Sequence, residues 1–253
     1  DCGKGESMEQ LEPVQRAMVV APHPDDAEFG CAGTVAKLAK AGKEVFYVIA
    51  TNGNKGGRDT DMSAAYLREE RRLEQEAAAA AVGVSEVVFL DFGDGELEDD
   101  HDFRRALVHQ IRRLQPDIVF TTDPFRTSFY IHRDHRMTGL VTIDAVFPYA
   151  RDRLHYPEDI DAGLSGHNVE EVFFWGSESP DVFIDIGEVM DSKIDSLKAH
   201  KSQLSDWGQG DNPASFEDMV RKMSNRTSVQ NKLSFEYAES FRRFGIRRMW
   251  EDT

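Results

Sequence analysis

The chain has 253 residues, of which 40% are hydrophobic and 30% charged, and its 46 acidic and 30 basic residues give a formal net charge of −16. An acidic surface repels a phosphate backbone, so this balance argues against a nucleic-acid-binding protein. No run approaches the roughly 20 apolar residues of a membrane-spanning helix, so we expect a soluble protein without membrane insertion.

The two ends of the chain and its cysteines set further expectations. Residues 1–7 precede the first methionine, Met8, and we interpret them as an extraneous or disordered tail. Residues 8–253 suit one domain with a substantial core, because they contain no linker, internal repeat or low-complexity run. The absence of a secretory signal pattern predicts a cytoplasmic protein. Cys2 and Cys31 are too few for a cysteine zinc site, so any metal must be held by histidine and carboxylate.

The first half of the sequence alternates apolar runs with amphipathic segments. We predict helices at 34–40, 63–81 and 103–114, and strands at 16–21, 44–50, 87–90 and 117–121. Uniformly apolar strands that alternate with helices indicate an α/β fold, Rossmann-like and doubly wound, with a mostly parallel sheet and helices on both faces. Ligands in such folds bind beyond the carboxyl ends of the strands, so the loops after the first, second and fourth strands should share one rim.

The second half is less regular. A helix is predicted at 138–150, a polar loop-rich stretch at 151–168, strands at 169–175 and 181–186, and a helix at 191–204. A loop is expected at 206–213. Because loops carry specificity in folds of this kind, we expect 151–168 and 206–213 to select the substrate.

Two loops at this rim concentrate histidine and carboxylate. The loop after the first strand holds His23, Asp25, Asp26 and Glu28, and the one after the fourth strand leads to His132-Arg133-Asp134-His135. Three His or carboxylate ligands with one open position are typical of catalytic zinc. The alternative is structural, because an aspartate at either position 25 or 26 could cap the following helix. Two such clusters at strand ends favour the metal.

These motifs resemble those of the LmbE-like (PIG-L) zinc-dependent N-deacetylases. The resemblance rests on the two loop clusters, with arginine at 133 where the family has proline. It is supported by Gly30-Cys31-Ala32-Gly33-Thr34, Thr51-Asn52-Gly53, the helix with Arg71 and Glu74, and Lys198-Ala199-His200-Lys201-Ser202-Gln203. It implies a hydrolase that removes an N-acetyl group from an N-acetylglucosamine-type amino sugar or its conjugate. We expect the protein to bind a small-molecule amino-sugar substrate and to form a homo-oligomer.

The resemblance also implies a role for each site residue. One Zn²⁺ per chain would be bound by His23, Asp26 and His135, although such a ligand set accepts other divalent metals. Asp25 would be the general base for attack by the zinc-bound water. His132, oriented by Asp134, would act as an imidazolium on the oxyanion or the leaving amine. Tyr130 would assist the oxyanion, and Arg71 would contact the substrate. The roles of Glu28 and His200 stay open.

Other functions are compatible with parts of the pattern. A related amidase acting on a bulkier acyl group would use the same centre, whereas a metallophosphoesterase usually needs two metals and more carboxylates. A non-catalytic sugar- or nucleotide-binding Rossmann-like module should carry a GxGxxG turn after its first strand. The sequence has His-Pro-Asp-Asp at that point, which favours the enzyme.

Overall fold

A single eight-stranded sheet forms the middle layer of the protein in the computed structural model, which describes residues 5–6, 11–57, 61–128, 130–204 and 213–246. The strand order is β1-β7-β8-β6-β5-β2-β3-β4. The strands are β1 Gly5–Glu6, β2 Arg16–Ala21, β3 Glu44–Thr51, β4 Glu86–Phe92, β5 Ile118–Thr122, β6 Glu171–Trp175, β7 Val182–Asp185 and β8 Ala238–Gly245. Only β8 runs against the others, since it pairs antiparallel with both β6 and β7.

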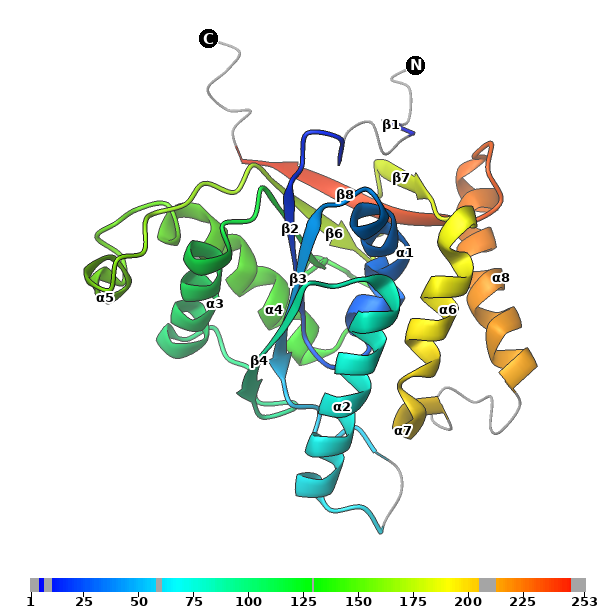
Figure 1. The fold of residues 1–253 in the computed structure, drawn as a ribbon, viewed down its shortest axis with the longest axis horizontal. Coiled ribbons are helices and arrows are strands. Elements are labelled where there is room, and N and C mark those ends of the chain that lie inside the picture. Colours follow the sequence, from blue (N-terminus) through cyan, green and yellow to red (C-terminus); the bar gives the residue numbers. More distant parts are fainter. Residues whose placement is uncertain (1–4, 7–10, 58–60, 129, 205–212, 247–253) are drawn as a thin grey trace.

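Helices cover both faces of the sheet (Figure 1). On one face lie α1 Asp26–Lys40, α2 Ala64–Val82, α6 Met190–Lys198 and α8 Pro213–Asn231. On the other lie α3 His101–Leu114, α4 Arg133–Asp144, which a kinked segment Ala145–Tyr149 follows, and the short α5 Pro157–Asp161. A 3₁₀ turn, Gly187–Val189, leads into α6, and α7 is Lys201–Leu204. The predicted doubly wound α/β fold is confirmed.

The core is divided by the sheet because successive strand residues point to opposite faces. In β2, Ala17 and Val19 belong to the cluster under α1 and α6, whereas Met18 and Val20 belong to the cluster under α3 and α4. Strands that bury both faces read as continuous apolar runs, which is why their positions could be predicted from the sequence.

The chain changes direction in the sheet beside β2. From β2 it proceeds outward to β3 and β4, and β5 then returns to the other side of β2. The crevice at this switch point lies beyond the carboxyl ends of β2 and β5, where the two His/Asp clusters follow.

Several predicted boundaries differ from the structure. Helix α1 begins at Asp26 and not at residue 34, and α4 begins at Arg133 and not at residue 138. His135 therefore lies in the first turn of a helix and not in a loop. The elements α8 and β8 were not predicted. Gly5–Glu6, from the expected tail, pair with β7, and the loop predicted at 206–213 lies almost wholly outside the described residues. Within the described ranges, every helix is too short or too polar to cross a bilayer.

Candidate metal centre and active site

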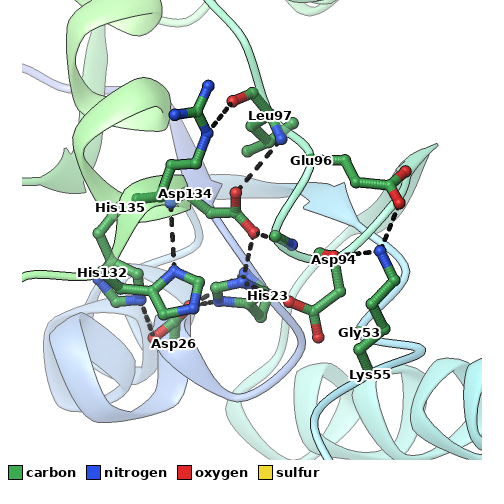
Figure 2. Close-up of polar contacts among 12 residues, drawn as sticks. His23, Asp26, Gly53, Lys55, Asp94, Glu96, Leu97, His132, Asp134 and His135 are labelled. Carbon is green, nitrogen blue, oxygen red and sulfur yellow. Dashed lines mark hydrogen bonds and ion pairs between the residues drawn. The ribbon is translucent and has the colours of Figure 1, made fainter.

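The two His/Asp clusters meet at the switch point of the sheet. His23 lies in the turn that follows β2, and Asp26 is the first residue of α1. His132 is the N-cap of α4, with Asp134 and His135 in the first turn of that helix. Figure 2 shows the three histidines and the two aspartates facing one another.

The predicted ligands His23, Asp26 and His135 present polar atoms to one point. Asp26 places Oδ2 2.9 Å from His23 Nδ1 and Oδ1 3.1 Å from His135 Nε2. The latter contact is within ion-pair range but is not aligned as a hydrogen bond, so His135 Nε2 is buried without a hydrogen-bond partner among the described residues. One donor atom from each residue lies within 4.8 Å of the other two. Such a set can surround one cation.

Asp134 contacts His23, which differs from the expectation that it orients His132. Its Oδ2 lies 2.9 Å from His23 Nε2 and accepts the amide hydrogen of Gly95 at 2.7 Å. Towards His132 the described hydrogen bond runs from the backbone amide of Asp134 to Nδ1, at 3.1 Å. The reason is helical geometry, because side chains two positions apart do not face each other. A carboxylate behind a ligand histidine fixes the ring and raises its basicity.

His23 is surrounded by carboxylates. Burial lowers its pKa, but the hydrogen bonds to Asp134, Asp26 and Asp94 outweigh burial and raise the pKa of His23 well above its ordinary value. A proton on His23 thus balances these carboxylates in the protein alone. A divalent cation bound at Nδ1 would take the place of that proton.

Asp94 was missed by the sequence analysis. It follows β4, and its Oδ1 lies 3.3 Å from His23 Nε2. Our prediction of the rim considered the loops after three strands and left out the loop after this one. The carboxyl end of β4 lies at the same edge of the sheet, which was the available signal.

A second possible ligand group shares His23 and contains Asp94, His132 and Asp134. In that group Asp134 already accepts amide hydrogens from Gly95 and Leu97, and His132 Nδ1 accepts one from Asp134. In the first group, by contrast, Nε2 of His135 faces Asp26 Oδ1 and makes no hydrogen bond to the described residues. The chemistry of the donor set therefore favours the predicted ligands.

Arg126, which the sequence analysis also missed, lies behind His135. Its Nη2 is 3.0 Å from His135 Nδ1 and donates to Thr122 Oγ1 at 2.5 Å. Because a guanidinium only donates, Nδ1 accepts here and a neutral ring carries its proton on Nε2. Cation binding through Nε2 requires that proton to leave. Thr122 Oγ1 lies 3.4 Å from Nδ1, within hydrogen-bonding distance of the same nitrogen.

Asp25 has a different environment from its neighbour Asp26. Its backbone has φ 92°, and its side chain makes no capping hydrogen bond to α1, so the structural reading as a helix cap does not apply to it. The carboxylate accepts a hydrogen bond from Arg71 Nη2 at 3.1 Å. Burial raises the pKa of Asp25 to about 6, although the charge of Arg71 opposes the shift. This carboxylate is thus ionised at neutral pH and able to accept a proton.

Arg71 is buried beneath the loop that follows β3. It donates to the carbonyl oxygens of Pro24 at 2.6 Å and Gly53 at 3.1 Å, in addition to Asp25. A Cβ on Gly53 or Gly56 would lie 2.7 or 2.4 Å from Arg71 Nη1, which explains the glycines of this loop. The described contacts of Arg71 are thus with the protein, and its contact with substrate stays a prediction.

The remaining predicted residues, Tyr130 and His132, flank the cluster. The ring of Tyr130 lies 5.1 Å from that of His135 and 6.2 Å from that of His132. Burial and the charge of His23 lower the pKa of His132, and its Nδ1 accepts a backbone amide hydrogen. A neutral His132 therefore carries its proton on Nε2, which differs from the imidazolium that we expected.

All of the predicted site residues except Asp134 line one cavity of about 860 Å³. The cavity continues from the cluster past Trp175 to Val220 and Met223 of α8. The unpredicted elements α8 and β8 thus complete its wall. A doubly wound sheet with a His/Asp cluster at its switch point, open to a cavity of this size, defines an α/β protein with a small-molecule site and a candidate metal centre.

Comparisons with known proteins identify the family. Residues 18–146 match the family model PIG-L, described as GlcNAc-PI de-N-acetylase. A diacetylchitobiose deacetylase of Thermococcus kodakarensis is 35% identical over 78% of this chain and 73% of its own length. A probable N-acetyl-alpha-D-glucosaminyl L-malate deacetylase 2 of Bacillus cereus is 29% identical over 86% of this chain and 93% of its own. The solved N,N'-diacetylchitobiose deacetylase of Pyrococcus horikoshii superposes with a TM-score of 0.84 at 30% identity, over 93% of this chain and 85% of that one. The chain belongs to the PIG-L (LmbE-like) family, which confirms the resemblance seen in its motifs.

Proposed function

We propose that the protein is a metal-dependent hydrolase that removes the N-acetyl group from an N-acetylglucosamine-type amino sugar or its conjugate. The observation that carries the proposal is the convergence of His23, Asp26 and His135 beside the non-ligating carboxylate of Asp25, in one cavity. The named activities of the related deacetylases support this choice of substrate and bond.

His23, Asp26 and His135 would hold the metal, and we propose Zn²⁺. The fit rests on the buried Nε2 of His135, which faces Asp26 Oδ1 and has no aligned hydrogen bond among the described residues, and on the pKa of Asp26. Burial raises that pKa, but the neighbouring His135 and His23 lower it well below its ordinary value. Two imidazoles and one carboxylate match the ligand types of catalytic zinc sites. When bound, the ion would supply Lewis-acid activation of water and of the amide carbonyl.

Asp25 is proposed as the general base. Its carboxylate accepts a proton from the attacking water as the new bond from water oxygen to carbonyl carbon forms. The same proton can then pass to the amine nitrogen as the carbon–nitrogen bond breaks, so that acetic acid and the free amine leave with atoms and charge in balance. A buried carboxylate with a pKa of about 6 suits both transfers near neutral pH.

His132 and Tyr130 are proposed to stabilise the developing oxyanion. With Nδ1 occupied by the Asp134 amide, the Nε2–H of His132 is available as a donor. Burial raises the pKa of Tyr130, so its phenol stays protonated and can also donate. Donors that are fixed before the reaction act most strongly where charge develops. Asp134 acts through His23, and Arg71 acts on Asp25, although contact of Arg71 with substrate remains part of the proposal.

The decisive experiment is an acetate-release screen over N-acetylglucosamine, diacetylchitobiose and conjugates with bulkier acyl groups, with the metal content measured on the same sample. We expect acetate release from at least one N-acetylated sugar and one metal per chain. Release of only longer acids would indicate the related amidase. No hydrolysis in the presence of sugar binding would indicate the non-catalytic module.

Two further expectations belong to this proposal. The protein should be cytoplasmic, and it should assemble as a homo-oligomer, as the family resemblance suggests. Light scattering of the purified protein tests the second expectation directly, since a monomeric mass at assay concentration would contradict it.

A further inference from the structure

Asp25 is fixed by two side chains from one helix. Arg71 and Gln75 lie one turn apart on α2, so both face the β2–α1 turn. Arg71 Nη2 donates to Asp25 Oδ2 at 3.1 Å, and Gln75 Oε1 accepts the backbone amide hydrogen of Asp25 at 3.0 Å. A left-handed backbone, φ 92°, is unfavourable for a residue with a side chain and persists only where its surroundings hold it. The hydrogen bond that the Asp25 amide donates to Gln75 is such a restraint.

Gln75 is itself oriented by a buried carboxylate. Its Nε2 donates to Glu28 Oε1 at 2.9 Å. Because an ionised carboxylate only accepts, the amide group cannot rotate by half a turn without losing both contacts. The oxygen of Gln75 is therefore directed at Asp25.

Glu28 is in turn held by His200. Glu28 Oε2 lies 3.1 Å from His200 Nε2. Burial lowers the pKa of His200, but the hydrogen bond to Glu28 and the charges of Glu28, Asp25 and Glu74 outweigh burial and raise it above its ordinary value. His200 thus serves as the donor to Glu28.

The chain of contacts is fully buried and has no part in the chemistry described so far. Glu28, Gln75 and His200 each have 0% exposure. Burying three polar groups is costly unless each is hydrogen-bonded, and removing one partner leaves the next without compensation. The three residues come from α1, α2 and the junction of α6 with α7. Their series of contacts leads to the backbone amide of Asp25, which donates to Gln75.

We propose that Gln75, Glu28 and His200 are positioning residues that hold Asp25 in the geometry needed for proton transfer. His200 lies outside residues 18–146, so the β2–α1 turn with Asp25 depends on a segment beyond the part matched by the family model. This inference rests on the proposed function of Asp25 as the base.

The first test replaces Gln75 by methionine, which keeps the volume and removes both hydrogen bonds. We expect kcat to fall about 10- to 100-fold, with KM and metal content little changed, because the metal ligands are untouched. The matched control is Thr34→Val. Thr34 lies in α1, like Glu28, and the substitution removes its buried hydrogen bond to Glu239 of β8. Thr34 has no described contact with Asp25. Equal losses of kcat in the two variants would overturn the inference.

Two further measurements separate positioning from a merely structural role. In an Asp25→Asn background, Gln75→Met should lose most of its effect on the residual rate, whereas additive effects would contradict action through Asp25. His200→Leu should lower kcat, and His200→Gln should restore much of it, because a glutamine amide can also donate to Glu28. Equal kcat values in these two variants would show that His200 is not a positioning residue.

Hydrogen exchange of the Asp25 amide keeps the inference distinct from the proposed function. The amide should be protected in the wild type and exchange faster in Gln75→Met, whether or not any sugar is hydrolysed. Unchanged protection would overturn the positioning. If the Asp25 amide exchanges faster in Gln75→Met as expected but the wild type releases no acetate from any substrate, the result would count against the proposed function alone.

Discussion

The two sides of the β2–α1 turn are built by different parts of the chain. On the metal side, His23 and Asp26 of the turn meet His135 of α4, and all three belong to short sequence motifs. On the other side, Asp25 is held by α2 and, through Glu28, by the α6–α7 junction.

The two sides give two adjacent aspartates opposite properties. Burial raises the pKa of each, but nearby His135 and His23 lower the pKa of Asp26 well below its ordinary value, whereas burial prevails over Arg71 at Asp25 and raises its pKa to about 6. Pairs of carboxylates whose environments separate their pKa values mark a division of roles. Asp26 is suited to bind a cation and Asp25 to exchange a proton.

The largest effect is expected from breaking the metal side. His135→Ala removes one of three ligands, so metal and activity should be lost together, with turnover reduced at least about 1000-fold because Lewis-acid activation is worth several kcal/mol. Metal analysis and acetate release on the same sample provide the measurement. Full metal content in this variant would show that the ligand set is wrong.

Breaking the other side should spare the metal. Asp25→Asn keeps the size of the side chain and removes the base, so we expect one metal per chain and a fall in kcat of about 10²- to 10⁴-fold. A rate close to that of the wild type would exclude Asp25 as the base. Loss of the metal would mean that the two sides are not separable.

His132, whose ring centroid lies 4.8 Å from that of His23, should give a smaller effect. His132→Ala removes the proposed oxyanion donor, and removal of one such donor typically costs about 10²- to 10³-fold in kcat. Metal content should change little, because Nδ1 of His132 binds a backbone amide. A marked loss of metal would place His132 among the ligands.

The smallest expected effect concerns stability and pH. His200 has a raised pKa in the folded protein, so its stabilising contribution is complete below its ordinary pKa of 6.5 and is lost as the pH rises through the folded value. The difference in unfolding free energy between wild type and His200→Gln should therefore be larger at pH 6 than at pH 9. Denaturant titrations at the two pH values measure it, and an unchanged difference would contradict the ion pair with Glu28.

The sequence predicted the metal side of the β2–α1 turn better than the side that holds Asp25. Strands buried on both faces read as apolar runs, and His-Pro-Asp-Asp and His-Arg-Asp-His are local motifs placed by the carboxyl ends of those strands. The direction of Asp134 toward His23 could not be predicted locally, because it depends on where α4 begins.

The rest of the site depends on pairings distant in sequence. Gln75 and His200 are ordinary helix and turn residues until the fold places both against Glu28. Strand β8, with Arg242 and Arg243, has little apolar pattern and forms because it pairs between β6 and β7. Tertiary packing overrides local preference in both cases.

The most direct test of the central claim is the position of the bound ion, determined by anomalous diffraction at the zinc absorption edge from crystals of the protein. We predict one anomalous peak within coordination distance of His23 Nδ1, Asp26 and His135 Nε2, adjacent to Asp25. A peak among Asp94, His132 and Asp134 instead, or no peak in a preparation that hydrolyses substrate, would contradict the proposed centre.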